Sequence, residues 1–154
     1  MGLNLLLNRR ILNWVSRKIG HQVGNGECWT LAETALRESE ARTSSDIMGA
    51  DNLTADADYR WGELVGELSQ LAEGDIIQFR NYVVTVDNGS SWWQESRPHH
   101  TAIVASVGAN GVVEVLECNV KGSRRVQRNT LYFQRSSSVS ISGSWFFYHP
   151  QPRA

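Results

Sequence analysis

The chain has 154 residues, of which 41% are hydrophobic and 20% charged, as in an ordinary globular domain with one sizeable core. Its formal net charge of −1 argues against a polyanion partner, because nucleic-acid-binding proteins usually carry a basic excess. No apolar run approaches the length of a membrane span, so we expect one domain over residues 1–154 with neither a nucleic-acid nor a membrane partner.

Residues 3–19 carry apolar side chains at helical spacing, and Gly20 is suited to end that helix. The N-terminus differs from a secretory signal, because Arg9 and Arg10 follow the apolar patch and no small-residue cleavage site comes after it. We therefore expect a cytoplasmic protein, or one that is exported without a cleaved signal peptide.

Cys28 stands where a glycine-containing loop runs into an apolar helix, expected over residues 28–40. The first turn of a helix has unpaired N–H groups and the positive end of the macrodipole, and both favour a thiolate. Cys28 is therefore a candidate nucleophile, although a lone cysteine can equally be a buried small hydrophobe. Gln22 lies six positions earlier, close enough to place an amide donor over the sulfur as part of an oxyanion hole.

The middle of the chain changes from helix to strand. Residues 41–58 are polar and rich in turn formers, which predicts a long surface loop, and residues 61–71 are predicted to form a short third helix. Strands are expected over residues 75–79, 82–86, 100–106, 112–117, 125–133 and 144–148. Helices followed by strands predict an α+β domain, with N-terminal helices packed on a small antiparallel β-sheet.

A thiol nucleophile needs a base, and the base needs a group that fixes its tautomer. His99 and His100 open a strongly apolar strand, and a hairpin turn at residues 109–111 joins this strand to one that ends in Glu117 and Asn119. Since the start of one hairpin strand faces the end of the other, we expect His100 to lie near Glu117 or Asn119. Alternation of side chains predicts that these two share a face and that Cys118 points away from them.

Three motifs carry a resemblance to a known family. The segment with Gln22, Gly26, Cys28 and Trp29 resembles the active-site segment of papain-like cysteine hydrolases. The Gly-Asp start of the strand at residue 74, the His strand and the Glu-x-Asn strand that follow are similar to those of CHAP and NlpC-like hydrolases. Residues 20–29 and 116–121 also resemble the papain-fold domain at the C-terminus of some fungal actin-patch adaptor proteins.

The resemblance implies a papain-like fold and a role for each candidate residue. Cys28 would be the nucleophile, His100 the base, and either Glu117 or Asn119 the group that orients the imidazole, with Gln22 as oxyanion donor. His99 would flank the cleft, because the Ala-Ile-Val that follows His100 matches the family pattern. This chemistry requires no cofactor or metal, and the four histidines do not stand at zinc-ligand spacings.

The substrate is open to several interpretations. The resemblance implies a thiol-dependent amidase or endopeptidase acting on peptidoglycan stem or bridge peptides, as a lysin or an antibacterial effector with a possible immunity or inhibitor protein as partner. An intracellular peptidase or deamidase acting on proteins is an alternative, as is a catalytically silent papain-fold module that binds a partner. Trp92 and Trp93, in a turn expected over residues 87–93, are either simple loop aromatics or the floor of a substrate groove.

Overall fold

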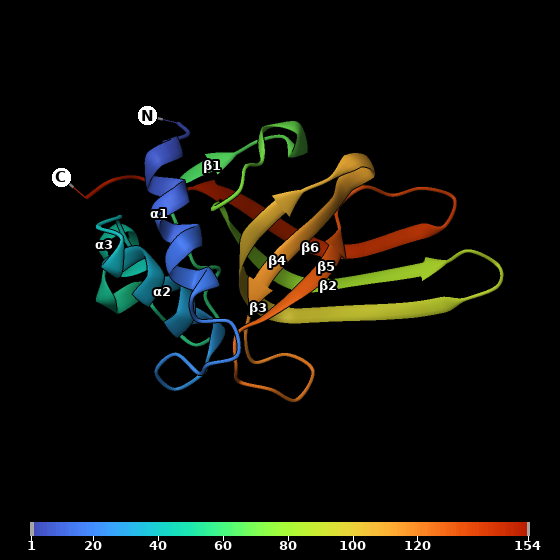
Figure 1. The fold of residues 1–154 in the computed structure, drawn as a ribbon, viewed down its shortest axis with the longest axis horizontal. Coiled ribbons are helices and arrows are strands. Elements are labelled where there is room, and N and C mark those ends of the chain that lie inside the picture. The colour runs from blue at the N-terminus through green and yellow to red at the C-terminus, as the bar shows by residue number, and fades with distance from the viewer. Residues whose placement is uncertain (1, 154) are drawn as a thin grey trace.

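The structure is a computed structural model that describes residues 2–153, and it places three helices at one end of a six-stranded antiparallel sheet (Figure 1). The strands follow the spatial order β1-β6-β2-β3-β4-β5. The helices are α1 (Leu5–Ser16), α2 (Cys28–Glu38) and α3 (Ser44–Met48). The strands are β1 (Glu63–Val65), β2 (Ile76–Asp87), β3 (Trp92–Val107), β4 (Val112–Glu117), β5 (Gln127–Tyr132) and β6 (Val139–His149). The predicted α+β class with an antiparallel sheet is confirmed.

The two long helices bury the apolar faces that their sequences predict. The side chain of Asn4 caps α1 by accepting a hydrogen bond from the Leu7 N–H at 3.0 Å. In α2, Leu31 and Leu36 are fully buried against the sheet and α1. Both helices are shorter than predicted, ending at Ser16 and Glu38. Within residues 2–153, no helix is long and apolar enough to cross a membrane.

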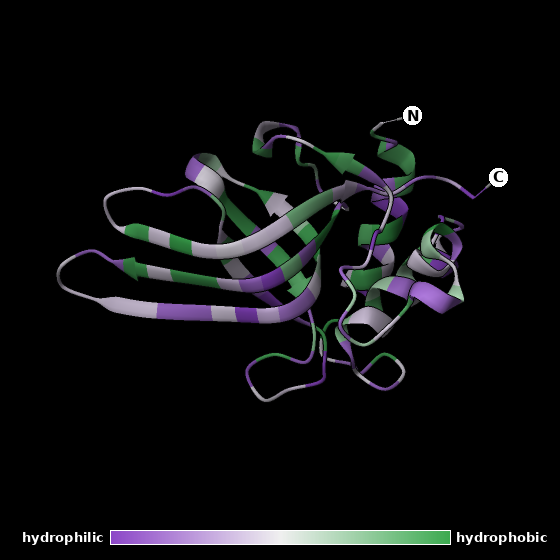
Figure 2. Cartoon of the chain, turned by 180° about the vertical axis from the view of Figure 1, so that it is seen from behind, coloured by the Kyte–Doolittle hydropathy of each residue, from purple (hydrophilic) through white to green (hydrophobic). Residues whose placement is uncertain are grey.

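The sheet buries apolar side chains on both of its faces. Ile76, Ile103 and Leu116 pack toward the helices, while Phe79, Val104 and other residues of the second cluster pack on the opposite face. In other parts of the strands, hydrophobic positions alternate with polar ones (Figure 2). Burial on both faces explains the dense Val and Ile content of β2, β3 and β4.

Strands β2 and β3 form one long hairpin that extends away from the helices (Figure 1). The prediction of two short strands over residues 75–86 was wrong, because β2 continues through Asn81 in a left-handed conformation with φ 53°. The turn is also tighter than predicted, since Trp92 and Trp93 already belong to β3 and pair with Asp87 and Val86.

The predicted helix over residues 61–71 was wrong. The segment instead forms β1, which pairs with the end of β6, and a 3₁₀ turn at Leu68–Gln70. Gly62 explains the difference, because its φ is 154° and a Cβ there would lie 2.2 Å from the carbonyl oxygen of His149. The predicted loop over residues 41–58 likewise contains the short helix α3 and a 3₁₀ turn at Ala50–Asn52.

Candidate active site

The N-terminus of α2 brings Cys28 against the start of the apolar part of β3. Cys28 is the first residue of α2, and no side chain caps this helix, so the N–H groups of its first turn stay available. The backbone N–H groups of Trp29 and Thr101 donate to the sulfur. The half-buried thiol opens into a pocket of about 360 Å³. Its other lining residues are Glu95, Ser96, Arg97, Pro98, His99, His100, Asn119, Val120 and Lys121.

The imidazole of His100 joins Cys28 to Glu117. One ring nitrogen, Nε2, lies 2.8 Å from Oε1 of Glu117, and the ring also forms a hydrogen bond with the Cys28 side chain. Since Nε2 contacts Glu117, Nδ1 is the nitrogen that faces the sulfur. Three side chains from α2, β3 and β4 thus form one hydrogen-bonded line, and the expected proximity of His100 and Glu117 is found.

The three groups shift one another's pKa values in the direction that favours an ion pair. Burial by itself raises the pKa of the Cys28 thiol, but hydrogen bonding and the charge of His100 lower it overall. Burial disfavours the imidazolium, yet its bonds to Cys28 and Glu117 raise the pKa of His100 to about 9. Burial raises the pKa of Glu117, but His100 and Arg97 together lower it to about 2. The lowered pKa of Cys28 and the raised pKa of His100 both favour the thiolate–imidazolium pair over the neutral pair.

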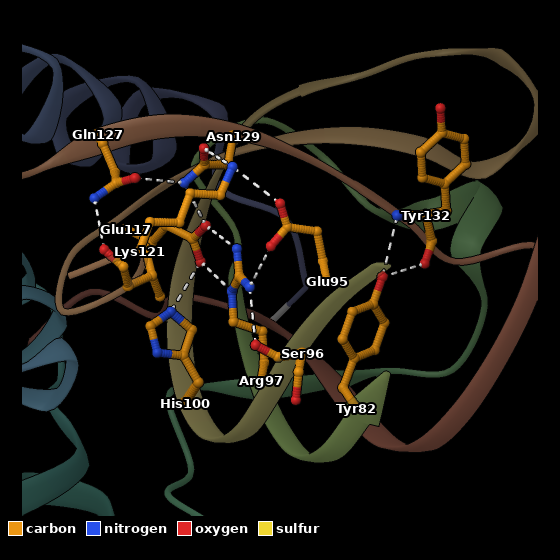
Figure 3. A network of polar contacts seen from close by, with 11 residues as sticks. Tyr82, Glu95, Ser96, Arg97, His100, Glu117, Lys121, Gln127, Asn129 and Tyr132 are labelled. Atoms are coloured by element: carbon orange, nitrogen blue, oxygen red, sulfur yellow. Dashed lines mark hydrogen bonds and ion pairs between the residues drawn. The ribbon is translucent and has the colours of Figure 1, made fainter. Parts of the chain in front are cut away.

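Glu117 is held by a larger set of donors than the sequence predicts. Its carboxylate accepts two hydrogen bonds from the guanidinium of Arg97 and one, at 2.8 Å, from the side-chain amide of Asn129 (Figure 3). Neither Arg97 nor Asn129 was identified from the sequence. Arg97 lies in the polar first half of β3, three positions before His100, so no local pattern distinguishes it from its polar neighbours.

Asn119 lies in the pocket but makes no hydrogen bond to His100. Strand β4 ends at Glu117, and Asn119 has a positive φ of 56°, so the alternation of a regular strand does not extend to it. Its exposed side chain lines the pocket beside Cys28. Cys118 is fully buried on the helix side of the sheet, where burial raises its pKa to about 12.

Gln22 does not reach Cys28 in this structure. Its side-chain amide donates to the carbonyl of Gly24 at 3.1 Å, and it borders a separate groove with Trp14 and Lys18. The N–H groups of Trp29 and Thr101 are the donors that contact the sulfur instead. Backbone donors of this kind have no residue-type signal, so the sequence identified neither.

His99 faces a different neighbour from His100. Its Nε2 lies 2.5 Å from the carbonyl oxygen of Ala57, and its ring meets that of Tyr59 edge-on at a centroid distance of 5.5 Å. Arg80 fixes the same loop through ion pairs with Asp56 and Asp58. His99 therefore anchors the loop that precedes β1, and it also lines the Cys28 pocket.

The structure does not bring Trp92 and Trp93 to Cys28. Both lie at the outer end of the β2–β3 hairpin, where Trp92 is 61% exposed and Trp93 packs on Tyr132. Neither lines the pocket at Cys28. Across residues 2–153, no three His, Cys, Asp or Glu side chains are arranged to hold a metal ion, and Cys28 and Cys118 are both free thiols.

A helix that presents a thiol to an antiparallel sheet bearing an imidazole is the arrangement of a papain-like, cysteine proteinase fold. The chain belongs to the family of the AIM3/BBC1 cysteine proteinase-fold domain, whose model matches residues 6–138. It is also 24% identical to Altered inheritance of mitochondria protein 3 of Debaryomyces hansenii, over 92% of this chain and 16% of that protein. The chain thus corresponds to a small part of this relative's length.

Two solved structures are similar to this fold. The crystal structure of Ly7917 has a TM-score of 0.58 and 20% identity, over 92% of this chain and 62% of that one. The crystal structure of Ly7917 with the hydrolyzing product of MDP has a TM-score of 0.57 and 24% identity, over 93% and 63%. At this identity the likeness concerns the fold, and the predicted resemblance to the papain fold is confirmed.

Proposed function

We propose that this domain is a cysteine hydrolase of amide bonds, with Cys28 as nucleophile, His100 as acid and base, and Glu117 as the group that orients the imidazole. The observation that carries the proposal is the unbroken hydrogen-bonded line from the half-buried sulfur through His100 to the buried carboxylate. A purely structural cysteine has no need of an imidazole bonded to a buried anion. The lowered pKa of Cys28 supports the same role.

The arrangement supports acylation followed by hydrolysis. The Cys28 thiolate attacks the amide carbonyl carbon and forms a C–S bond, and His100 gives its proton to the leaving amine as the C–N bond breaks. Water then attacks the thioester while His100 takes the water proton. The C–S bond breaks, a carboxylic acid leaves, and Cys28 and His100 return to their starting state.

The oxyanion of each tetrahedral intermediate needs donors near the sulfur. The Cys28 N–H at the start of α2 is one candidate, because helix geometry leaves it without a partner. Gln22 remains a proposed second donor, but its amide must first leave the Gly24 carbonyl. Asn119 also lines the pocket and has an exposed amide that can approach a substrate.

Peptidoglycan stem or bridge peptides are the first proposed substrate, supported by the similarity of the His and Glu-x-Asn strands to those of wall hydrolases. Peptide or side-chain amides of proteins are the second, supported by membership of the AIM3/BBC1 cysteine proteinase-fold family and by similarity to Altered inheritance of mitochondria protein 3. The two classes share the reactive amide, so the geometry around Cys28 serves either. Binding of a partner without catalysis is the third.

The test uses both substrate classes and one matched variant. Purified sacculi of several wall chemotypes and a protein-derived peptide library are incubated with the wild-type chain and with Cys28→Ala. New amines or shortened fragments detected by mass spectrometry with the wild type alone would support hydrolysis and assign the substrate class. Intact substrates in both arms would overturn hydrolysis and leave a partner-binding role.

A further inference from the structure

Arg97 makes the most extensive contact with Glu117. Its Nε donates to Oε1 at 3.0 Å and its Nη2 donates to Oε2 at 2.6 Å, which is the two-pronged geometry of an arginine–carboxylate pair. Arg97 is 2% exposed and Glu117 is fully buried. The guanidinium leaves one acceptor position on Oε1, and His100 occupies it.

The contact between Arg97 and Glu117 requires a local break in the side-chain alternation of β3. Arg97 and His100 are three positions apart, and a regular strand would direct their side chains to opposite faces. Both nevertheless reach the same carboxylate, at the place where Asn81 of the paired strand has a positive φ and the pairing of β2 with β6 shifts register. The distortion thus places a cation and an imidazole on one buried anion.

The ion pairs continue from Arg97 back to the pocket. Nη1 of Arg97 lies 3.1 Å from Glu95, and Glu95 lies 2.9 Å from Nζ of Lys121 (Figure 3). Charges alternate along this line from the Cys28 thiolate to Lys121. Because Glu117 lies between Arg97 and His100, its carboxylate can remain ionised although it is removed from solvent.

We propose that Arg97 is a positioning residue of the active site, which holds the Glu117 carboxylate in the orientation and ionised state that keep His100 bonded to Cys28. This inference rests on the proposed function of Cys28 and His100. Without the guanidinium, Glu117 keeps only Asn129 and His100 as donors, and burial then favours the protonated carboxyl. A protonated Glu117 no longer stabilises the imidazolium, so the Cys28 thiolate is lost at a higher pH than in the wild type.

Several charged or titratable groups lie near this line of charges. They are Arg97, Glu95 and His100 on β3, Lys121 in the loop after β4, Tyr82 on β2, Cys118 beside β4, and Glu27, Cys28 and Arg124 near the start of α2. Of these, only Arg97 and His100 bond directly to Glu117. Substitution of Arg97 therefore tests one contact of the carboxylate while leaving His100 in place.

The experiment measures the rate of Cys28 alkylation by iodoacetamide from pH 4 to pH 10, with each thiol followed by mass spectrometry. The variants are Arg97→Gln, which removes the charge, and Arg97→Lys, which keeps the charge without the two-pronged contact. Arg128→Gln is the matched control, because Arg128 also pairs with a glutamate, Glu114, at a more exposed site away from Cys28. The rate of Cys118 reports unfolding, because this thiol is fully buried in the folded chain.

We expect the acidic midpoint of the Cys28 profile to rise by about one pH unit or more in Arg97→Gln, by less in Arg97→Lys, and to stay unchanged in Arg128→Gln. An unchanged or lower midpoint in both Arg97 variants would overturn the inference. If Arg97→Gln unfolds, so that Cys118 reacts as fast as Cys28, Arg97→Lys decides the question by the same criterion. A wild-type profile like that of an ordinary thiol would instead overturn the proposed function.

Discussion

The Nε2 atom of His100 lies 2.8 Å from Oε1 of Glu117, and the two side chains are 5% and 0% exposed. A buried carboxylate is costly unless it is paired, and here it is paired with two cations and an amide. The contact fixes which imidazole nitrogen is left for Cys28. The catalytic potential of the site thus depends on a residue that does not itself touch the sulfur.

Replacement of Glu117 tests this dependence. Glu117→Gln keeps the shape of the side chain but removes the charge, so we expect acylation of Cys28 to slow by roughly 10²–10⁴-fold, as when the acidic member of a catalytic triad is neutralised. Unfolding free energy should fall by about 3–5 kcal/mol, because the buried Arg97 loses its two-pronged partner and keeps only Glu95 as an anion. The measurements are single-turnover acylation and urea unfolding.

Two matched variants accompany this substitution. Glu114→Gln removes a half-buried glutamate of the same strand that lies away from the Cys28 pocket, and it should leave acylation unchanged. Asn119→Ala removes the alternative orienting residue and should slow acylation by less than about 10-fold, because Asn119 makes no hydrogen bond to His100. An effect of Asn119→Ala larger than that of Glu117→Gln would transfer the orienting role to Asn119.

The two adjacent histidines should differ sharply in effect. His100→Ala removes the group that moves the proton and should slow acylation by about 10²–10⁴-fold. His99→Ala removes the contact with the Ala57 carbonyl, so its main effect should be a loosened loop and most of the acylation rate should remain. Acylation kinetics and hydrogen exchange of the amides at residues 54–60 measure the two effects. The reverse ranking would assign the base to His99.

The pH dependence follows from the shifted pKa values. Thiolate forms as the pH rises through the lowered pKa of Cys28, and the imidazolium is lost as the pH rises through about 9. Amide hydrolysis should therefore rise on the acidic side and fall near pH 9. The stability that comes from the raised pKa of His100 is fully present below its unfolded value of 6.5 and is lost as the pH rises through about 9. A rate that keeps rising above pH 10 would contradict this description of the pair.

A pair of glycines tests the backbone at the irregular pairing of β2 with β6. Gly143 of β6 has a φ of 90°, and a Cβ there would lie 2.0 Å from the carbonyl oxygen of Asn81. Gly89 in the hairpin turn has a φ of 92° but open space around it. Gly143→Ala should therefore lower the unfolding free energy by about 1–3 kcal/mol more than Gly89→Ala, measured by urea unfolding. Equal falls in unfolding free energy in the two variants would mean that the positive φ alone, and not the close approach to Asn81, destabilises Gly143→Ala.

Much of the fold follows from local patterns in the sequence. The apolar spacing of α1 and α2, the Val-rich strands and the turn at residues 109–111 all correspond to elements of the structure. The prediction of a helix over residues 61–71 was wrong. The apolar spacing of this segment suits a helix, but pairing with β6 and the φ of Gly62 impose an extended chain. Strand pairing between distant segments overrides a short local pattern of this kind.

The candidate site also contains residues that could be placed from local sequence patterns and residues that could not. Cys28, His100 and Glu117 could be placed together because a helix start and a hairpin register are local features. Arg97 could not, because its contact with Glu117 depends on a distortion that breaks the alternation of β3. Trp92 and Trp93, for which a substrate groove was one of two interpretations, lie away from the Cys28 pocket because β2 and β3 continue as one hairpin past the expected turn.

The rate at which iodoacetamide alkylates Cys28 at pH 6 tests the claim that Cys28 is an activated nucleophile. At that pH an ordinary thiol is almost entirely protonated, whereas a thiol paired with an imidazolium reacts. We predict that Cys28 reacts at least about 100-fold faster than Cys118, and that His100→Ala removes most of this difference while the chain stays folded. Equal rates for the two cysteines in the folded wild-type chain, or a rate at Cys28 that His100→Ala leaves unchanged, would contradict the claim.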